Sequence, residues 1–291
     1  MDKSNLILID FSWLYNKYYF VSSYTITQEF EGEKPQDELE LRLYGMLSQF
    51  LKRMGECYPD SRIFCVLDSP TSTLKNKDIF DGYKQNRDKE AKKEVYSCLN
   101  RIIKALANFL PKSFSFIKAK HYEADQIISY MIKKYGKDRE TIIFSGDKDL
   151  IQLTAYPNVK TSDKFEKGKF IIRTDVDLFA KFKNSKGEDF TRISTNKRDI
   201  LKYRVLKGDP SDNLSPVFPR IRDTEIGDII KECWTSEDYL TEDIMDAVVE
   251  SVRVTNTKLA DKLGASKDTW LRNYKIMDLF YVDDIEVKEL R

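Results

Sequence analysis

The chain has 291 residues, 41% of them hydrophobic, and its 49 Lys and Arg nearly balance its 48 Asp and Glu, giving a formal net charge of +1. This length allows one large domain with a full core plus a smaller one. The near-neutral balance excludes attraction of acidic partners by overall charge, so any basic surface must be local. We expect a soluble cytoplasmic protein, because no apolar stretch reaches membrane-spanning or signal-peptide length. The four cysteines lack metal-type CxxC spacing and fit free thiols of a reducing compartment better than disulfides.

Short apolar runs rich in β-branched or aromatic residues alternate with amphipathic runs in the first half of the chain. The apolar runs predict buried strands. They are residues 6–10, 62–68, 113–119 and 141–145. The amphipathic runs have apolar residues at three-to-four spacing and predict helices. They are residues 37–56, 95–110 and 123–135. The alternation indicates an α/β fold, with a mostly parallel central sheet flanked by helices.

The later part of the chain changes character. Residues 158–175 predict a strand, a turn at Gly168 and a second strand, as a hairpin that extends the sheet edge. From Asn196 onward the pattern is almost wholly helical, with turns near 210–219 and Gly264. The polar run KNSKGEDFT marks a boundary near residue 190. We therefore predict an α/β domain over 1–190 and a helical domain over 191–291.

Carboxylates occur at four separate places, and most of them follow a predicted strand. They are Asp10, Asp68, Glu123, Asp125, Asp147, Asp149, Asp209 and Asp212. The carboxyl ends of parallel strands border the crevice in which open α/β sheets bind ligands, so we expect these side chains to converge. Carboxylates a few ångströms apart resist being ionised together unless cations neutralise them. Because all the candidate ligands are oxygens, the pattern favours a site for Mg²⁺.

Each carboxylate pair also has an ordinary structural interpretation. Asp147 and Asp149 face the same side if extended, yet DxD is common in solvated loops. Glu123 and Asp125 fit a helix start, where acidic residues act as caps. Asp209 and Asp212 are one helical turn apart, so they could share a face and bind one ion. The alternative is a Pro-containing turn in which the Asp side chains supply the hydrogen bonds of the turn. Only the combination of all four places favours metal binding.

A basic segment, residues 73–94, follows Asp68 and combines cations with the aromatic residues Phe80 and Tyr83. Its cations are Lys75, Lys77, Lys84, Arg87, Lys89, Lys92 and Lys93. This combination suits single-stranded nucleic acid, because cations hold phosphates while rings stack on bases. On a helix, Lys84 and Arg87 would present two cations to one phosphate. The alternative is a solvated helix held by internal salt bridges.

Six motifs in order resemble the flap-endonuclease family of 5′-nucleases, above all its bacteriophage ribonuclease H branch. Between Leu6 and Leu214 they read LILIDFS, VLD, FDGYKQNR, YEADQ, FSGDKDLIQL and KGDPSDN. The resemblance implies a helical arch over the active site, at about 71–95, and a helix-three-turn-helix element that grips duplex DNA. It also implies a 5′-3′ exonuclease or flap endonuclease of DNA replication or repair. Such an enzyme hydrolyses phosphodiesters, as in RNase H-like primer removal, and uses two Mg²⁺ ions, which Mn²⁺ can replace.

The resemblance also assigns roles by position. Asp10, Asp68, Glu123 and Asp125 form a first metal group, and Asp147, Asp149, Asp209 and Asp212 form a second. Lys84 and Arg87 match cations that hold the scissile phosphate, and with Asp10 and Asp68 they are the expected catalytic residues. Further expected contacts to nucleic acid are Tyr83, Lys92, Lys93, Arg220 and Arg222. The implied partners are DNA or an RNA–DNA hybrid with a 5′ end, flap or fork, and a single-strand-binding protein or sliding clamp. If phage-encoded, the protein would act in the cytoplasm of a bacterial host.

Two positions depart from the family pattern. The family's EADD motif ends here in Gln126, an amide that binds Mg²⁺ less strongly than a carboxylate. After KGDPSDN, a Gly-rich turn is replaced by SPVFPRIRD, whose Pro216 and Pro219 lack amide donors, so Arg220 and Arg222 are expected to substitute side-chain contacts. These departures keep one alternative open, a non-catalytic or weakly catalytic protein that binds branched DNA. A second alternative is a PIN-like ribonuclease, which has a related acidic sheet site but would not explain the basic segment or KGDPSDN. GxxxxGK[ST] and GxGxxG loops are absent, which argues against a P-loop motor and a Rossmann enzyme.

Overall fold

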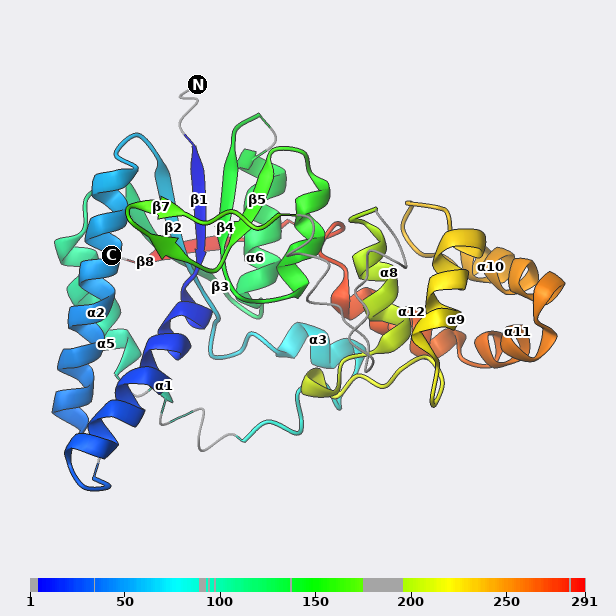
Figure 1. Cartoon of the computed structure of the whole chain (residues 1–291), viewed down its shortest axis with the longest axis horizontal. Helices are drawn as coiled ribbons and strands as arrows, with labels where there is room; N and C mark the ends of the chain where they lie inside the picture. The colour runs from blue at the N-terminus through cyan, green and yellow to red at the C-terminus, as the bar shows by residue number, and fades with distance from the viewer. Residues whose placement is uncertain are drawn as a thin grey trace.

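An α/β body and a helical body lie side by side in the computed structural model (Figure 1). The structure describes residues 5–33, 35–88, 93, 95–96, 98–136, 138–174, 196–282 and 284–290. The α/β body contains most of the residues up to 174 and the last strand, residues 287–290, and the helical body contains most of those after 196, with Tyr83 and Ile151 packed into its core. The expected boundary near residue 190 lies outside the described residues.

The central sheet has six strands in the order β5-β4-β1-β2-β3-β8. They are β1 (Leu6–Asp10), β2 (Arg62–Leu67), β3 (Phe114–Ala119), β4 (Thr141–Phe144), β5 (Val159–Ser162) and β8 (Val287–Leu290). The first five are mutually parallel, and β8 pairs antiparallel with β3. The predicted strands and the mostly parallel sheet are therefore confirmed.

Helices cover both faces of this sheet (Figure 1). Ile7 and Ile9 of β1 face one core, and Leu6 and Leu8 face the other, so the run is apolar throughout rather than alternating. The first core is covered by α1 (Phe11–Glu29), α2 (Gln36–Cys57) and α5 (Leu99–Phe109). The second is covered by α6 (Ala124–Met131), which continues as the π-helical turn η1 (Ile132–Gly136).

Three elements differ from the sequence expectations. Helix α1 follows β1 directly and was not expected, because its aromatic residues do not form a single apolar stripe. The predicted hairpin does not extend the large sheet: β6 (Phe165–Glu166) and β7 (Lys169–Phe170) form a separate two-stranded sheet, with Gly168 at φ 80° in the turn. Of the residues in the predicted hairpin, only those of β5 join the large sheet, where β5 is one edge strand and β8 is the other. Strand β8 returns from the helical body and was not expected either.

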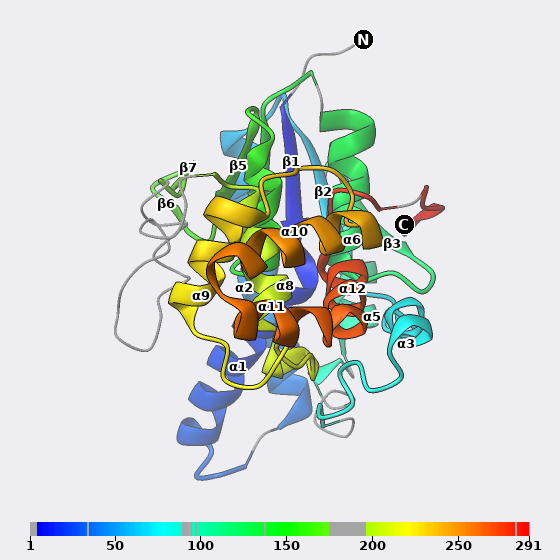
Figure 2. The same cartoon turned by 90° about the vertical axis from the view of Figure 1, so that its right-hand side faces the viewer.

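The helical body begins close to the carboxyl edge of the sheet. It contains α8 (Asp199–Lys207), α9 (Asp223–Asp228), α10 (Glu242–Thr255), α11 (Thr257–Gly264) and α12 (Lys267–Met277), with the short turns η4 (Pro210–Asp212) and η5 (Ile229–Cys233). Its core includes Trp234 and Trp270, whose rings meet edge to face at 5.1 Å. Figure 2 views the molecule from this side, with α10 and α11 in front of the sheet.

The basic segment contacts both bodies, through Lys75 and Tyr122 on one side and Lys84 and Asp212 on the other. Its described part starts with α3 (Leu74–Ile79), which lies between the α/β body and α12 (Figure 1). None of the helices within the described ranges is both long enough and apolar enough to cross a membrane.

Candidate active site

The first two carboxylates lie at the carboxyl edge of the sheet. Asp10 ends β1 and caps α1, because its Oδ1 accepts a hydrogen bond of 2.9 Å from the Trp13 amide. Its Oδ2 accepts a second from the Ser145 hydroxyl at 2.9 Å. Asp68 follows β2, and its amide donates to Ser12 Oγ at 2.9 Å. Burial raises the pKa of Asp10 to about 7, and repulsion from Asp68 and Asp147 adds to the effect.

The start of α6 lies beside them. Asp68 Oδ1 accepts a hydrogen bond of 2.8 Å from the Ala124 amide, between Glu123 and Asp125. Glu123 is the N-cap of α6 and Asp125 lies in its first turn, so the pair straddles the helix start; in a helix interior two such side chains would point in different directions. Burial raises the pKa of Asp125 well above its ordinary value, and the charges of Glu123, Asp147 and Asp149 add to it. The first group is therefore crowded with negative charge.

Asp147 and Asp149 follow β4 in a tight turn. The Asp147 amide donates to Ser145 Oγ at 3.0 Å, and the Asp149 amide donates to Asp147 Oδ1 at 2.9 Å. Asp149 then begins the 3₁₀ turn η2 (Asp149–Ala155). Ser145 ties this turn to the first group, because its hydroxyl donates to Asp10 and accepts from the Asp147 amide. The charge of Asp147 also adds to the raised pKa of Asp10 and of Asp125. The carboxylates form one continuous cluster.

The helical body supplies the last two carboxylates. Oxygen atoms of Asp149, Asp209 and Asp212 lie within 4.8 Å of one another. Asp209 also shapes its own turn, because its Oδ1 accepts from the Ser211 amide at 2.8 Å and the Ser211 hydroxyl at 2.7 Å. Asp209 therefore does both things that the sequence left as alternatives: it supplies the hydrogen bonds of its own turn, and it lies close to Asp149 and Asp212. Burial alone would raise the pKa of Asp209, but these hydrogen bonds and the charge of Arg204 hold it below its ordinary value.

The basic segment docks on this turn through its backbone. The Lys84 amide donates to the Asp212 carbonyl at 3.0 Å, and Asn213 Nδ2 donates to the Gly82 carbonyl at 2.8 Å. Asn86 Nδ2 donates to the Pro210 carbonyl at 2.9 Å. Lys84 takes a left-handed conformation, with φ 52°, so the helix considered for Lys84 and Arg87 is wrong: these residues lie in successive turns.

Both cations nevertheless point at the carboxylates. Lys84 Nζ forms an ion pair with Glu123 Oε1 and lies 3.7 Å from Asp212 Oδ2. Arg87 Nη2 lies 2.6 Å from Asp212 Oδ1. Burial opposes the charge of Lys84, but the neighbouring carboxylates outweigh it and raise its pKa above the ordinary value. The two cations therefore stay charged and partly neutralise the cluster.

Tyr83 is not an exposed platform for a base. Its side chain is only 2% exposed and belongs to the core of the helical body, although the surrounding sequence looked too polar for a core. The hydroxyl donates to Glu123 Oε2 at 2.6 Å and lies 3.2 Å from Asp212 Oδ2. Phe80 is also engaged, because the Arg272 guanidinium lies 4.4 Å from its ring centroid.

Gln126 has a structural role at the start of α6. Its Oε1 accepts a hydrogen bond of 3.1 Å from the Glu123 amide, and its Nε2 lies 3.4 Å from Asn76 Oδ1. The amide thus caps the helix that presents Glu123 and Asp125. An amide suits this position because it offers one acceptor and one donor where both are used.

The remaining expected contacts lie at the edges of the site. Lys93 is exposed and, with Asp68, lines a cavity of about 460 Å³. Lys92 lies outside the described residues. Arg220 is exposed at φ 62°, and Arg222 pairs with Glu225 at 2.9 Å. In place of a Gly-rich turn, the segment around them buries Val217, Phe218 and Ile221 in the core of the helical body.

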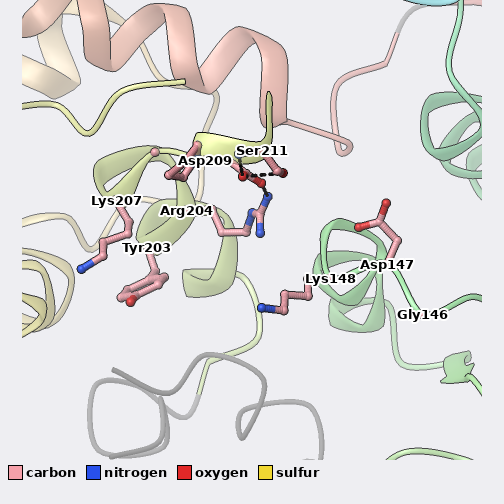
Figure 3. Close-up of a pocket in the computed structure, with 10 residues that line it drawn as sticks. Gly146, Asp147, Lys148, Tyr203, Arg204, Lys207, Asp209 and Ser211 are labelled. Atoms are coloured by element: carbon pink, nitrogen blue, oxygen red, sulfur yellow. Dashed lines mark hydrogen bonds and ion pairs between the residues drawn. The ribbon is translucent and has the colours of Figure 1, made fainter. Parts of the chain in front are cut away.

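Arg204 is a site residue that the sequence reasoning missed. From α8, its Nη2 lies 2.5 Å from Asp149 Oδ1 and 2.6 Å from Asp209 Oδ2. Figure 3 shows the guanidinium reaching Asp209 at the edge of a cavity of about 610 Å³, which Lys148 and Lys207 also line. In the sequence, the one hint that Arg204 belongs to the site is that it lies five residues before Asp209.

The donor set fits hard divalent cations. All eight side chains offer carboxylate oxygens, the ligands that Mg²⁺ and Mn²⁺ prefer. The raised pKa values of Asp10, Asp125 and Asp149 have burial as their main cause and repulsion between neighbours as a further one. Bound cations would relieve that repulsion.

Comparisons with known proteins agree with this geometry. Residues 5–184 match a family described as the 5′-3′ exonuclease, N-terminal resolvase-like domain. A 5′-3′ exonuclease of Buchnera aphidicola subsp. Baizongia pistaciae is 35% identical over 153 residues, which cover 51% of this chain and 45% of that protein. The ribonuclease H of enterobacteria phage T4 is 23% identical over 235 residues, covering 77% of this chain and 66% of that protein. The chain thus matches less than two thirds of the length of either relative.

A solved structure shares the fold over most of the chain. It is the bacteriophage T5 flap endonuclease in a pseudo-enzyme-product complex with DNA and metal ions. The TM-score is 0.65 with 16% sequence identity, over 95% of this chain and 89% of that one.

Proposed function

The chain belongs to the 5′-3′ exonuclease family, and we propose that it is a metal-dependent 5′-nuclease that hydrolyses phosphodiesters near the 5′ end of a nucleic acid strand. One observation carries the proposal. Carboxylates from the ends of β1, β2 and β4, from the start of α6 and from the turn before α9 form a single cluster, and the basic segment places Lys84 and Arg87 against it.

The carboxylates would hold two divalent ions. Asp10, Asp68, Glu123 and Asp125 would bind the first ion, and the other four carboxylates would bind the second. Mg²⁺ fits best because every donor is an oxygen, and Mn²⁺ would substitute. When bound, such ions activate a water molecule and stabilise the leaving 3′-oxygen.

Lys84 and Arg87 would hold the scissile phosphate. Both now pair with carboxylates, Lys84 with Glu123 and Arg87 with Asp212. Phosphate oxygens can replace these partners because they offer the same charge and similar geometry. The two cations would then neutralise charge that develops on the phosphoryl group.

The substrate would be DNA or an RNA–DNA hybrid with a 5′ end, flap or fork. The T5 relative is described in a complex with DNA and metal ions, and the T4 relative is named a ribonuclease H. The helical body would hold the duplex through the turn between α8 and α9, with Arg220 and Arg222 contacting phosphates. A sliding clamp or single-strand-binding protein as partner stays a prediction.

One assay tests the function. End-labelled 5′-flap DNA, nicked duplex, RNA–DNA hybrid and plain single-stranded RNA are incubated with Mg²⁺, Mn²⁺ or EDTA. We expect cleavage near the 5′ end of the first three substrates with either metal, and none in EDTA. Preferential cleavage of plain RNA would instead indicate a PIN-like ribonuclease. Tight binding of the flap without cleavage in either metal would indicate a non-catalytic protein that binds branched DNA.

A further inference from the structure

Arg204 lies between two carboxylates that the proposed function assigns to the second metal ion. A single nitrogen, Nη2, lies 2.5 Å from Asp149 Oδ1 and 2.6 Å from Asp209 Oδ2. The side chain is only 13% exposed, so solvent screens these charges weakly. The two carboxylates come from different bodies, Asp149 from the turn after β4 and Asp209 from the turn after α8. Arg204 therefore links the two bodies at the metal cluster.

The position of the guanidinium is where a cation is needed. Oxygens of Asp149, Asp209 and Asp212 lie within 4.8 Å of one another, and like charges at that separation repel strongly in a partly buried site. Arg204 Nη2 lies within ion-pair distance of two of these three carboxylates, Asp149 and Asp209. A divalent ion that binds the same oxygens is therefore repelled by the guanidinium of Arg204, which already lies beside them.

The structure also offers the side chain a second place. Arg204 lines the cavity of about 610 Å³ shown in Figure 3, together with Tyr203, Lys148 and Lys207. This volume exceeds that of a guanidinium group, and long arginine stems change rotamer without backbone movement. The side chain has room to leave the carboxylates while α8 stays fixed.

We propose that Arg204 is the resident counter-ion of the second metal group. In the metal-free protein it holds Asp149 and Asp209 together, and a divalent ion displaces its guanidinium into the adjoining cavity. Arg204 is thus a positioning residue that weakens the second ion relative to the first and sets the metal concentration at which both ions are bound. This inference rests on the proposed metal-dependent function.

The test measures Mn²⁺ binding without substrate, by titration calorimetry and electron paramagnetic resonance. The variants are Arg204→Met, which keeps the length of the stem without its charge, and Arg204→Lys, which keeps the charge. Arg253→Met is the matched control, because Arg253 also bridges two carboxylates, Glu250 at 3.3 Å and Asp261 at 2.6 Å, but on the exposed surface. Circular dichroism confirms that each variant is folded.

We expect wild type to bind one Mn²⁺ ion tightly and a second weakly. Arg204→Met should lower the Kd of the weak ion by roughly tenfold or more, since one repelling charge is gone. Arg204→Lys should stay near wild type, and Arg253→Met should be unchanged. In EDTA, Arg204→Met should melt at a lower temperature than wild type, with a larger rise on adding Mn²⁺.

An Arg204→Met protein that binds Mn²⁺ no more tightly than wild type would overturn the inference, because the guanidinium would then not compete. If that result accompanies normal flap cleavage by wild type, the proposed nuclease function stands without it. If Arg204→Met binds Mn²⁺ more tightly but wild type cleaves none of the substrates, the counter-ion role stands and the nuclease function fails.

Discussion

The hydroxyl oxygen of Tyr83 lies 2.6 Å from Oε2 of Glu123, although 40 positions separate the two residues in the sequence. The same hydroxyl lies 3.2 Å from Oδ2 of Asp212. A hydroxyl has one hydrogen to donate, so these two carboxylates share it. Tyr83 therefore joins a carboxylate of the proposed first metal group to one of the proposed second group, and its ring is buried.

Replacing Tyr83 with Phe should separate this orienting role from packing. The ring keeps its place, so we expect a stability loss of only about 1 kcal/mol from the missing hydrogen bonds. Turnover of a 5′-flap substrate should fall by roughly tenfold, because Glu123 and Asp212 lose a common donor. Tyr83→Ala is the contrasting variant and should unfold much more easily through a cavity. Equal turnover for wild type and Tyr83→Phe would show that the hydroxyl does not orient the carboxylates.

Asp147→Asn should lose most nuclease activity with little change in the fold. Asp147 lies between the two proposed metal groups, because its amide donates to the Ser145 hydroxyl that binds Asp10, and its Oδ1 accepts from the Asp149 amide. We expect a loss of roughly a hundredfold in turnover, as for a misplaced catalytic metal. The melting temperature in EDTA should stay equal or rise slightly, because one charge leaves a repulsive cluster. Asp60→Asn, at an exposed turn, is the control and should cleave like wild type. Cleavage at the wild-type rate by Asp147→Asn would contradict the role of Asp147 as a metal ligand.

Lys84→Ala should impair turnover more than equilibrium binding to a forked duplex. Lys84 points at Glu123 inside the cluster, where it would meet only the scissile phosphate, while most duplex contacts would lie elsewhere. Single-turnover cleavage measures the rate, and fluorescence anisotropy measures the affinity. The rate should fall by roughly tenfold more than the affinity. Lys75→Ala is the control from the same segment, since Lys75 donates to the Tyr122 hydroxyl at 2.9 Å. Equal losses in rate and affinity would make Lys84 a docking residue.

The strands and the carboxylates could be predicted because the signals are local. A buried parallel strand needs an unbroken apolar run, and the residue that ends the run lies at the edge of the sheet, so Asp10, Asp68 and Asp147 can be placed from the sequence. Helix α6 could be predicted for a similar reason, with Glu123 at its start. These positions depend on pattern more than on tertiary contacts.

Other residues could not be predicted because only tertiary packing gives them their role. Arg204 looks like any charged residue on a helix until the helical body brings Asp209 toward Asp149. Tyr83 lies in a polar stretch, and its burial depends on a core built from residues after 196. Strand β8, with the sequence VKEL, has one strand neighbour and only half-buried or exposed residues, so it carries no apolar signal.

The metal-free protein should show an unusual pH dependence through Asp10. Burial raises the pKa of this carboxyl from 3.8 to about 7, so it binds its proton more tightly in the folded chain than in the unfolded chain. Stability in EDTA should therefore fall as the pH rises from about 4 to about 7, by at most about 4 kcal/mol from this residue. Asp10→Asn keeps a helix-capping oxygen but has no such titration.

Urea unfolding in EDTA at several pH values measures the effect. The advantage of Asp10→Asn over wild type should grow through this interval and level off above it. Saturating Mn²⁺ should reverse the order, because the ion stabilises only the protein that binds it well. A difference between the two proteins that is the same at pH 4.5 and pH 8 would contradict the raised pKa of Asp10.

Gln126→Glu should destabilise the protein rather than improve its metal site. The Glu123 amide would keep its acceptor, but a carboxylate oxygen would replace the Gln126 amide group that lies 3.4 Å from Asn76 Oδ1. Asn76 cannot simply flip, since its Nδ2 donates to Glu123 Oε2 at 3.1 Å. We expect a loss of roughly 2 kcal/mol at pH 8, as for a buried acceptor without a donor.

At pH 5 that loss should shrink, because a protonated Glu side chain can donate to Asn76 again. Gln49→Glu, on the exposed face of α2, is the matched control and should change stability by much less. Mn²⁺ affinity should not rise in Gln126→Glu, because the side chain is directed at the cap of α6. A tighter Mn²⁺ site or faster flap cleavage would instead mean that Gln126 stands where a metal ligand is missing.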